Sequence, residues 1–126
     1  MQGFDFHGLE WVLSAVLAVV FLVTGVNKAF RYEKSREIFP WVKDAPRALV
    51  RFIGIAEILG ALGLILPVAT GIYPWLTYYA AVGLAILMLM AGTFHGQRRE
   101  GTEAALNLIL LLMLAFVAYS RRGLLP

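Results

Sequence analysis

Glu57 is the residue of this chain with the clearest chemical potential, because the other residues at positions 52–66 are all uncharged. An ionised carboxylate at the centre of a membrane helix costs about 2.5–3.5 kcal/mol on insertion scales, so a glutamate there usually serves a partner or a task. Three roles are open to Glu57: a structural salt bridge, a proton-linked or ligand-binding group, or a neutral acid without a task.

Other polar residues lie toward one end of the apolar segments and form a candidate ligand-binding or proton-linked pocket with Glu57. They are Thr24, Asn27, Lys28, His95 and Asn107. Lys28 is the expected salt-bridge partner, because its long stem can carry the ammonium about one turn inward. Thr24 is expected either to bond its own backbone or to line the pocket. His95 either caps a helix end or faces the bundle, and Asn107 either joins helices or contacts a ligand.

The residue types that are absent limit the chemistry. The chain contains no cysteine, which excludes disulfides and cysteine-ligated metal or iron–sulfur sites. His95 and Glu57 are too few for a specific metal site, and no nucleophile–base pair indicates a stand-alone enzyme. A redox role would therefore require a bound cofactor, for which a quinone or a lipid is a candidate, or a partner subunit.

The elements that must position these residues are predicted to be four membrane-spanning helices in one domain over residues 1–126. Hydrophobic residues make up 60% of the chain, and residues 58–97 contain no Asp, Glu, Lys or Arg. Such a pattern is typical of membrane spans of about 20 residues. The predicted spans are residues 9–30, 45–66, 72–95 and 102–120, with Asp44 as N-cap of the second and a hairpin at 67–71. The fold class is thus an all-α four-transmembrane-helix bundle in a lipid bilayer.

Small residues predict close packing around Glu57. The same helix face, at offsets of three and four residues, carries Gly54, Gly60 and Ala61, and the small-residue surface extends to Ala56 and Gly63. Because small side chains let helices approach closely, Glu57 is expected to face protein and not lipid. The same surfaces are compatible with a homodimer.

The distribution of basic residues predicts the orientation. Lys and Arg are concentrated around residues 28–51 and at Arg98 and Arg99, whereas Arg121 and Arg122 lie at the opposite end. The positive-inside rule then places both termini outside. This orientation explains the net charge of +3 better than nucleic-acid binding does. Residues 31–47 interleave aromatic and basic side chains, which predicts either a solvated loop with an interfacial anchor or a site for anionic lipid or a partner.

The sequence resembles the DoxX-like family of small four-span membrane proteins. The matching segments are FLVTGVNK at 21–28, GIAEILGALGLILP at 54–67, AGTFH at 91–95 and Asn107. The resemblance covers nearly the whole chain and implies a four-helix bundle in the bacterial inner membrane. It also implies that the glycine, lysine, glutamate, histidine and asparagine positions of the family correspond to Gly25, Lys28, Glu57, His95 and Asn107. Some relatives look like subunits of quinone-linked sulfur oxidation or of redox-stress complexes, and others assist export or receptor assembly.

Three functions follow from these observations. The favoured one is a membrane subunit of a redox-linked complex with a partner subunit, in which the polar pocket binds a small hydrophobic ligand, with a quinone as a candidate. One alternative is a proton-coupled small-molecule transporter, although small four-span exporters carry their glutamate in the first span. The other alternative is a non-catalytic membrane assembly factor.

Overall fold

The computed structural model describes residues 7–126, which are almost entirely helical. The long helices are α1 (His7–Phe30), α3 (Arg47–Thr70), α4 (Leu76–Gln97) and α5 (Gly101–Arg121). The short helix α2 (Tyr32–Ile38) and the 3-10 helix η1 (Pro40–Asp44) connect α1 to α3, and the 3-10 helix η2 (Arg122–Leu124) follows α5. All four long helices are long and apolar enough to cross a membrane. The prediction of an all-α four-span bundle is confirmed.

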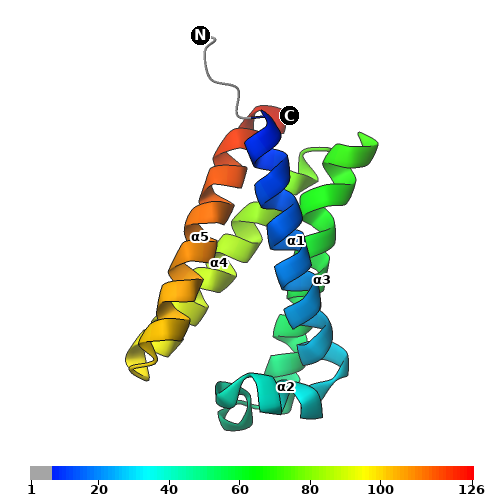
Figure 1. Ribbon diagram of the computed structural model, residues 1–126. Helices are drawn as coiled ribbons and strands as arrows, with labels where there is room; N and C mark the ends of the chain where they lie inside the picture. The colour runs from blue at the N-terminus through cyan, green and yellow to red at the C-terminus, as the bar shows by residue number, and fades with distance from the viewer. Residues whose placement is uncertain (1–6) are drawn as a thin grey trace.

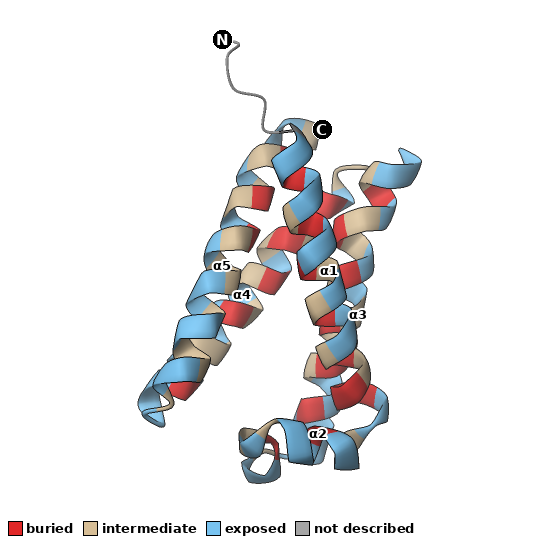
Figure 2. Ribbon diagram, in the orientation of Figure 1, coloured by how far each residue is buried: buried red, intermediate tan, exposed pale blue. Residues whose placement is uncertain are grey.

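The long helices form two antiparallel pairs, α1 with α3 and α4 with α5. The pairs meet near the C-terminus and spread apart toward α2 (Figure 1). The buried core includes Leu17 of α1, Leu64 of α3 and Leu114 of α5. Figure 2 shows exposed residues on the outer sides of the helices, and many of these are apolar, for example Leu59 at 64% exposure and Leu112 at 61%. Such outer faces suit contact with lipid.

Small residues set the distance between α3 and both of its neighbours. At the crossing with α1, a Cβ added to Gly54 would lie 2.6 Å from the backbone nitrogen of Ala29 and 2.7 Å from the carbonyl oxygen of Gly25. At the contact with α4, a Cβ added to Gly63 would lie 2.7 Å from the Cβ of Ala80. These distances leave no room for a larger side chain. Glycine therefore permits the close approach of α3 to α1 and to α4.

α3 continues through Pro67, so the predicted hairpin at residues 67–71 is wrong. A proline inside a helix leaves the carbonyl group four residues earlier without its usual N–H donor. Here that carbonyl belongs to Gly63, and it accepts a hydrogen bond of 2.8 Å from the hydroxyl of Thr77 in α4. The helix ends at Gly71, whose φ of 75° lies in the left-handed region that favours glycine. The connection to α4 consequently begins later than predicted.

The connection between α1 and α3 also differs from the prediction. Asp44 ends η1 and does not cap α3, whose N-cap is Pro46 without a side-chain hydrogen bond. The Asp44 carboxylate instead accepts a hydrogen bond of 2.8 Å from Arg98, which follows α4. This contact links the two helix pairs at the end where they spread apart (Figure 1).

Candidate functional site

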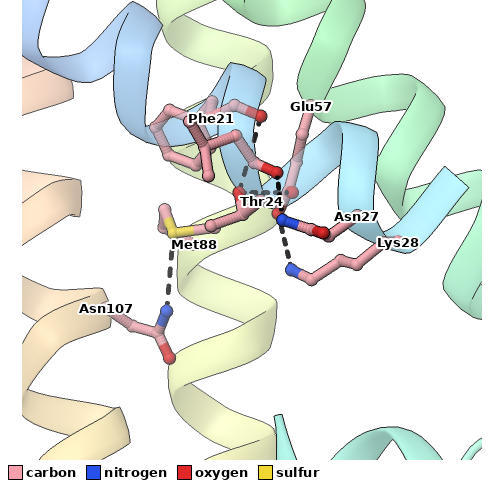
Figure 3. A network of polar contacts seen from close by, with 8 residues as sticks. Phe21, Thr24, Asn27, Lys28, Glu57, Met88 and Asn107 are labelled. Atoms are coloured by element: carbon pink, nitrogen blue, oxygen red, sulfur yellow. Dashed lines mark hydrogen bonds and ion pairs between the residues drawn. The ribbon is translucent and has the colours of Figure 1, made fainter. Parts of the chain in front are cut away.

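Glu57 lies on the inner face of α3 and is only 2% exposed, so it faces protein as expected. Its Oε2 accepts a hydrogen bond of 3.0 Å from the Lys28 ammonium, and its Oε1 accepts one of 2.9 Å from the Thr24 hydroxyl. Both donors come from α1, where they lie one turn apart (Figure 3). The predicted salt bridge is present. Thr24 contacts its own backbone only at 3.5 Å, to the carbonyl of Phe21, so its shorter hydrogen bond is the one to Glu57.

Aromatic rings surround the ammonium of Lys28. Its Nζ lies 5.0 Å from the centroid of the Phe39 ring and 5.4 Å from that of Trp41. Both rings belong to the connection between α1 and α3. Cation–π contacts are stronger when the cation is out of water, and the Lys28 side chain is 10% exposed. The buried pair is therefore compensated on both sides, by hydrogen bonds at the carboxylate and by rings around the ammonium.

His95 belongs to a second polar group, at the end of α4. The His95 side chain is buried, and its Nδ1 lies 2.6 Å from one oxygen of Glu100. Arg98 donates to the other oxygen of Glu100 at 3.0 Å and to Asp44 at 2.8 Å. The hydrogen bond with His95, followed by that from Arg98, lowers the pKa of Glu100. Hydrogen bonds to Asp44 and Glu100 raise the pKa of Arg98.

A cavity of about 630 Å³ lies between the two helix pairs and brings most of the predicted site residues together. Its polar lining includes Thr24, Lys28, Glu57, His95 and Asn107. The remaining wall is mainly apolar and includes the rings of Phe39, Trp41 and Phe94. This size and this mixture of groups are typical of a small-molecule site. Within residues 7–126, no three His, Asp or Glu side chains are arranged to hold a metal ion.

The two predicted asparagines are placed differently. Asn107 lines the cavity, and its Nδ2 donates to the sulfur of Met88 at 3.5 Å (Figure 3). The Asn107 Oδ1 is buried and has no hydrogen-bond partner within the described part of the chain. Asn27 does not line the cavity, and its Nδ2 donates to the carbonyl of Val23 at 2.9 Å. The structure therefore does not bring Asn27 together with the cavity residues, because its side chain bonds its own helix.

The remaining predicted packing residues contribute in different ways. A Cβ added to Gly60 would lie 2.6 Å from Leu84 of α4. Ala61 belongs to the buried core, whereas Ala56 is partly exposed. The small-residue face of α3 thus serves two neighbouring helices and not one.

Two parts of the charge network were not found from the sequence. The first is Glu100, for which the only signal was a carboxylate shortly after a histidine at a helix end. The second is a buried ion pair at the other end of the bundle, where Arg121 of α5 lies 2.9 Å from Glu10 of α1. The Arg121 guanidinium also lies 4.9 Å from the centroid of the Trp11 ring. The sequence signal for this ion pair was one acidic and one basic residue at the ends of two apolar spans.

A comparison with known protein families identifies the family of this chain. The sequence model of the DoxX-like family matches residues 12–117, which include every polar residue of the cavity named above. No curated protein and no solved structure matches the chain. Since the family match covers most of the sequence, the chain belongs to the DoxX-like family.

Proposed function

We propose that this DoxX-like protein is a membrane subunit that binds one small, mainly apolar ligand in the cavity between its helix pairs. We further propose that it serves a redox-linked complex in the bacterial inner membrane and that the ligand is a quinone. The observation that carries the proposal is the cavity of about 630 Å³, because it gathers polar side chains from separate helices within an apolar wall. Small-molecule sites commonly enclose roughly 300–1,000 Å³ and use a few polar groups to orient the ligand.

The polar groups of the cavity fit the head of such a ligand. Lys28 uses one N–H for Glu57, so its other donors are available to a carbonyl oxygen. The Asn107 Oδ1 offers an acceptor without a partner in residues 7–126. A quinone needs donors at its carbonyl oxygens and acceptors when it is reduced, and when bound it would supply the electron-transfer chemistry. The protein's own part is to bind the ring between apolar side chains, to orient its oxygens and to exclude water.

We propose that both termini lie outside, because most of the basic residues lie at the α2 end of the bundle. Nine of the eleven Lys and Arg residues lie between residues 28 and 51 or at Arg98 and Arg99. Arg121 and Arg122 at the opposite end weaken this asymmetry, although Arg121 is buried beside the Glu10 carboxylate. The positive-inside rule counts Lys and Arg and not net charge, so the excess at the α2 end supports the proposed orientation.

The pairing of Glu57 supports ligand binding over proton-coupled transport. A carboxylate that carries protons must exchange its partners in every cycle, and Glu57 accepts hydrogen bonds from both Lys28 and Thr24. Proton-coupled transport predicts that Glu57→Gln abolishes uptake or resistance. Ligand binding predicts that Glu57→Gln lowers affinity for a quinone without any transport phenotype.

Filling the cavity tests the proposal directly. Ala91 lines the cavity, whereas Ala105 lies exposed on α5 and outside it. In detergent, a short-chain quinone should quench the fluorescence of Trp41, which also lines the cavity. Ala91→Phe should weaken this binding at least about tenfold, the effect of losing roughly 1.4 kcal/mol, whereas Ala105→Phe should bind like the wild type.

Equal binding by the wild type and both variants would contradict the proposed cavity site. Mass spectrometry of the purified protein provides the second measurement. Retention of a different apolar molecule by the wild type and Ala105→Phe, and its loss from Ala91→Phe, would support the site but reject quinone as the ligand.

A further inference from the structure

A second, smaller pocket of about 170 Å³ lies between the end of α1 and the beginning of α3. Its lining consists of Ala29, Phe30, Tyr32, Arg47 and Arg51, none of which lines the larger cavity. The guanidinium carbon of Arg47 lies 4.6 Å from the centroid of the Tyr32 ring. Such a cation–π contact restrains the guanidinium group, and its N–H groups remain able to donate to a ligand. The pocket is therefore a concave site with two cationic groups, one of them oriented by an aromatic ring.

Neither arginine of this pocket has a carboxylate partner in residues 7–126. The nearby acidic side chains are engaged elsewhere, in the pairs Glu33–Arg36, Glu37–Lys34 and Asp44–Arg98. Arg47 and Arg51 are one helical turn apart on α3, so their positive charges repel each other. They also lie at the N-terminal end of the helix, whose dipole disfavours cations, and the first turn contains no acidic residue. An anion in the pocket would reduce both the repulsion between the two arginines and their unfavourable interaction with the helix dipole.

The position of the pocket indicates the source of the anion. α1 ends at Phe30 and α3 begins at Arg47, so the pocket lies at the boundary of two spanning helices. Phe30 is 71% exposed and Phe52, beside Arg51, is 67% exposed. Exposed phenylalanine rings beside basic residues suit the region where lipid headgroups meet acyl chains. A volume of about 170 Å³ has room for several water-sized groups, and therefore for a phosphate.

We propose that Arg47 and Arg51 bind the phosphate of an anionic phospholipid headgroup, with Tyr32 orienting Arg47. The planar fork of arginine matches phosphate oxygens and can donate two hydrogen bonds to one group. The acyl chains of the bound lipid lie against the exposed rings of Phe30 and Phe52. This site is independent of the occupant of the larger cavity.

Native mass spectrometry of the full-length protein in detergent tests the proposal, with phosphatidylglycerol, phosphatidylcholine and inorganic phosphate as separate probes. The wild type should retain one phosphatidylglycerol in preference to phosphatidylcholine. The variant Arg47→Gln/Arg51→Gln should bind phosphatidylglycerol about thirtyfold more weakly, through loss of two contacts of the strength usual for basic residues at an anionic membrane surface. The control Lys34→Gln/Arg36→Gln removes the same charge from α2, and its lipid affinity should match the wild type.

Equal weakening in both double variants would overturn the proposal, because general surface charge would then explain the binding. Displacement of the lipid by inorganic phosphate at equal concentration would overturn the proposal that the bound phosphate belongs to a lipid, and would assign the pocket to free phosphate. The variant Arg47→Lys/Arg51→Lys keeps the charge and the fold but loses the planar fork, so its affinity should fall between those of the wild type and the glutamine variant. Wild-type affinity in the glutamine variant would also reject the site.

Discussion

Removing the ammonium from the buried pair should destabilise the bundle by about 3–5 kcal/mol, the usual cost of leaving one buried charge without its partner. The side chains of Lys28 and Glu57 are 10% and 2% exposed, so solvent cannot replace the lost contact. Lys28→Met retains an apolar stem, but Glu57 then keeps only the hydrogen bond from Thr24. Glu57→Gln should cost less, because the ammonium keeps its contacts with Phe39 and Trp41.

The double variant Lys28→Met/Glu57→Gln shows whether the two charges act as a pair. Replacing both members of a buried ion pair with neutral groups is often close to neutral in free energy. The double variant should therefore be more stable than Lys28→Met alone, with a coupling energy of at least about 2 kcal/mol. The measurement is reversible unfolding in mixed micelles with increasing SDS, followed by circular dichroism.

A surface lysine provides the matched control for this cycle. Lys34 is half-exposed and lies 4.0 Å from Glu37. Lys34→Met should change the free energy of unfolding by less than about 0.5 kcal/mol, because exposed pairs contribute little. A coupling energy below about 0.5 kcal/mol between positions 28 and 57 would refute the reasoning, since the two side chains would then act independently.

Three further predictions concern packing, pH and the helix that contains proline. Gly54→Ala should cost about 1–3 kcal/mol through overpacking against α1, whereas Gly83→Ala, with no atom within 4 Å of the added Cβ, should be neutral or slightly stabilising by thermal unfolding. The pKa of Glu100 is lowered from its ordinary value of 4.5 in the folded protein. The ionised Glu100 carboxylate therefore stabilises the fold above pH 4.5, and this stabilisation is lost as the pH falls through the folded-state pKa. Glu100→Gln should therefore flatten the fall in melting temperature below pH 4.5. Thr77→Val should cost about 1–3 kcal/mol, because it leaves a buried carbonyl without a donor, and Pro67→Ala should reduce that cost by restoring a backbone N–H.

The fold was predictable because span length and hydropathy follow directly from the thickness of the bilayer. The end of α3 was not, since a proline near the end of an apolar run is compatible with a helix stop or with continuation. Continuation requires a donor for the carbonyl of Gly63, and that donor is Thr77, on the next helix. Only the packing of α3 against α4 supplies this information.

The candidate site was predictable where residue type alone restricts the partners. A lysine and a glutamate in neighbouring apolar spans have few alternatives to each other, and the structure pairs Lys28 with Glu57. Asparagine is less restricted, because its amide can bond its own helix, as Asn27 does. The position of Trp41 in the cavity lining depends on how α2 and η1 fold. That segment is too short to show a hydrophobic periodicity that would predict this position.

Two buried ion pairs fix the position of α1 beside the cavity. Arg121 joins α5 to α1 through Glu10, at the end of the bundle where the core is closed. Lys28 joins α1 to α3 beside the cavity, and both pairs are buried. Because separating a buried charge from its partner is costly, these contacts fix how α1 lies against α3 and α5. We therefore expect the polar groups of the cavity to be largely in place for the proposed ligand, and such preorganisation lowers the free-energy cost of binding.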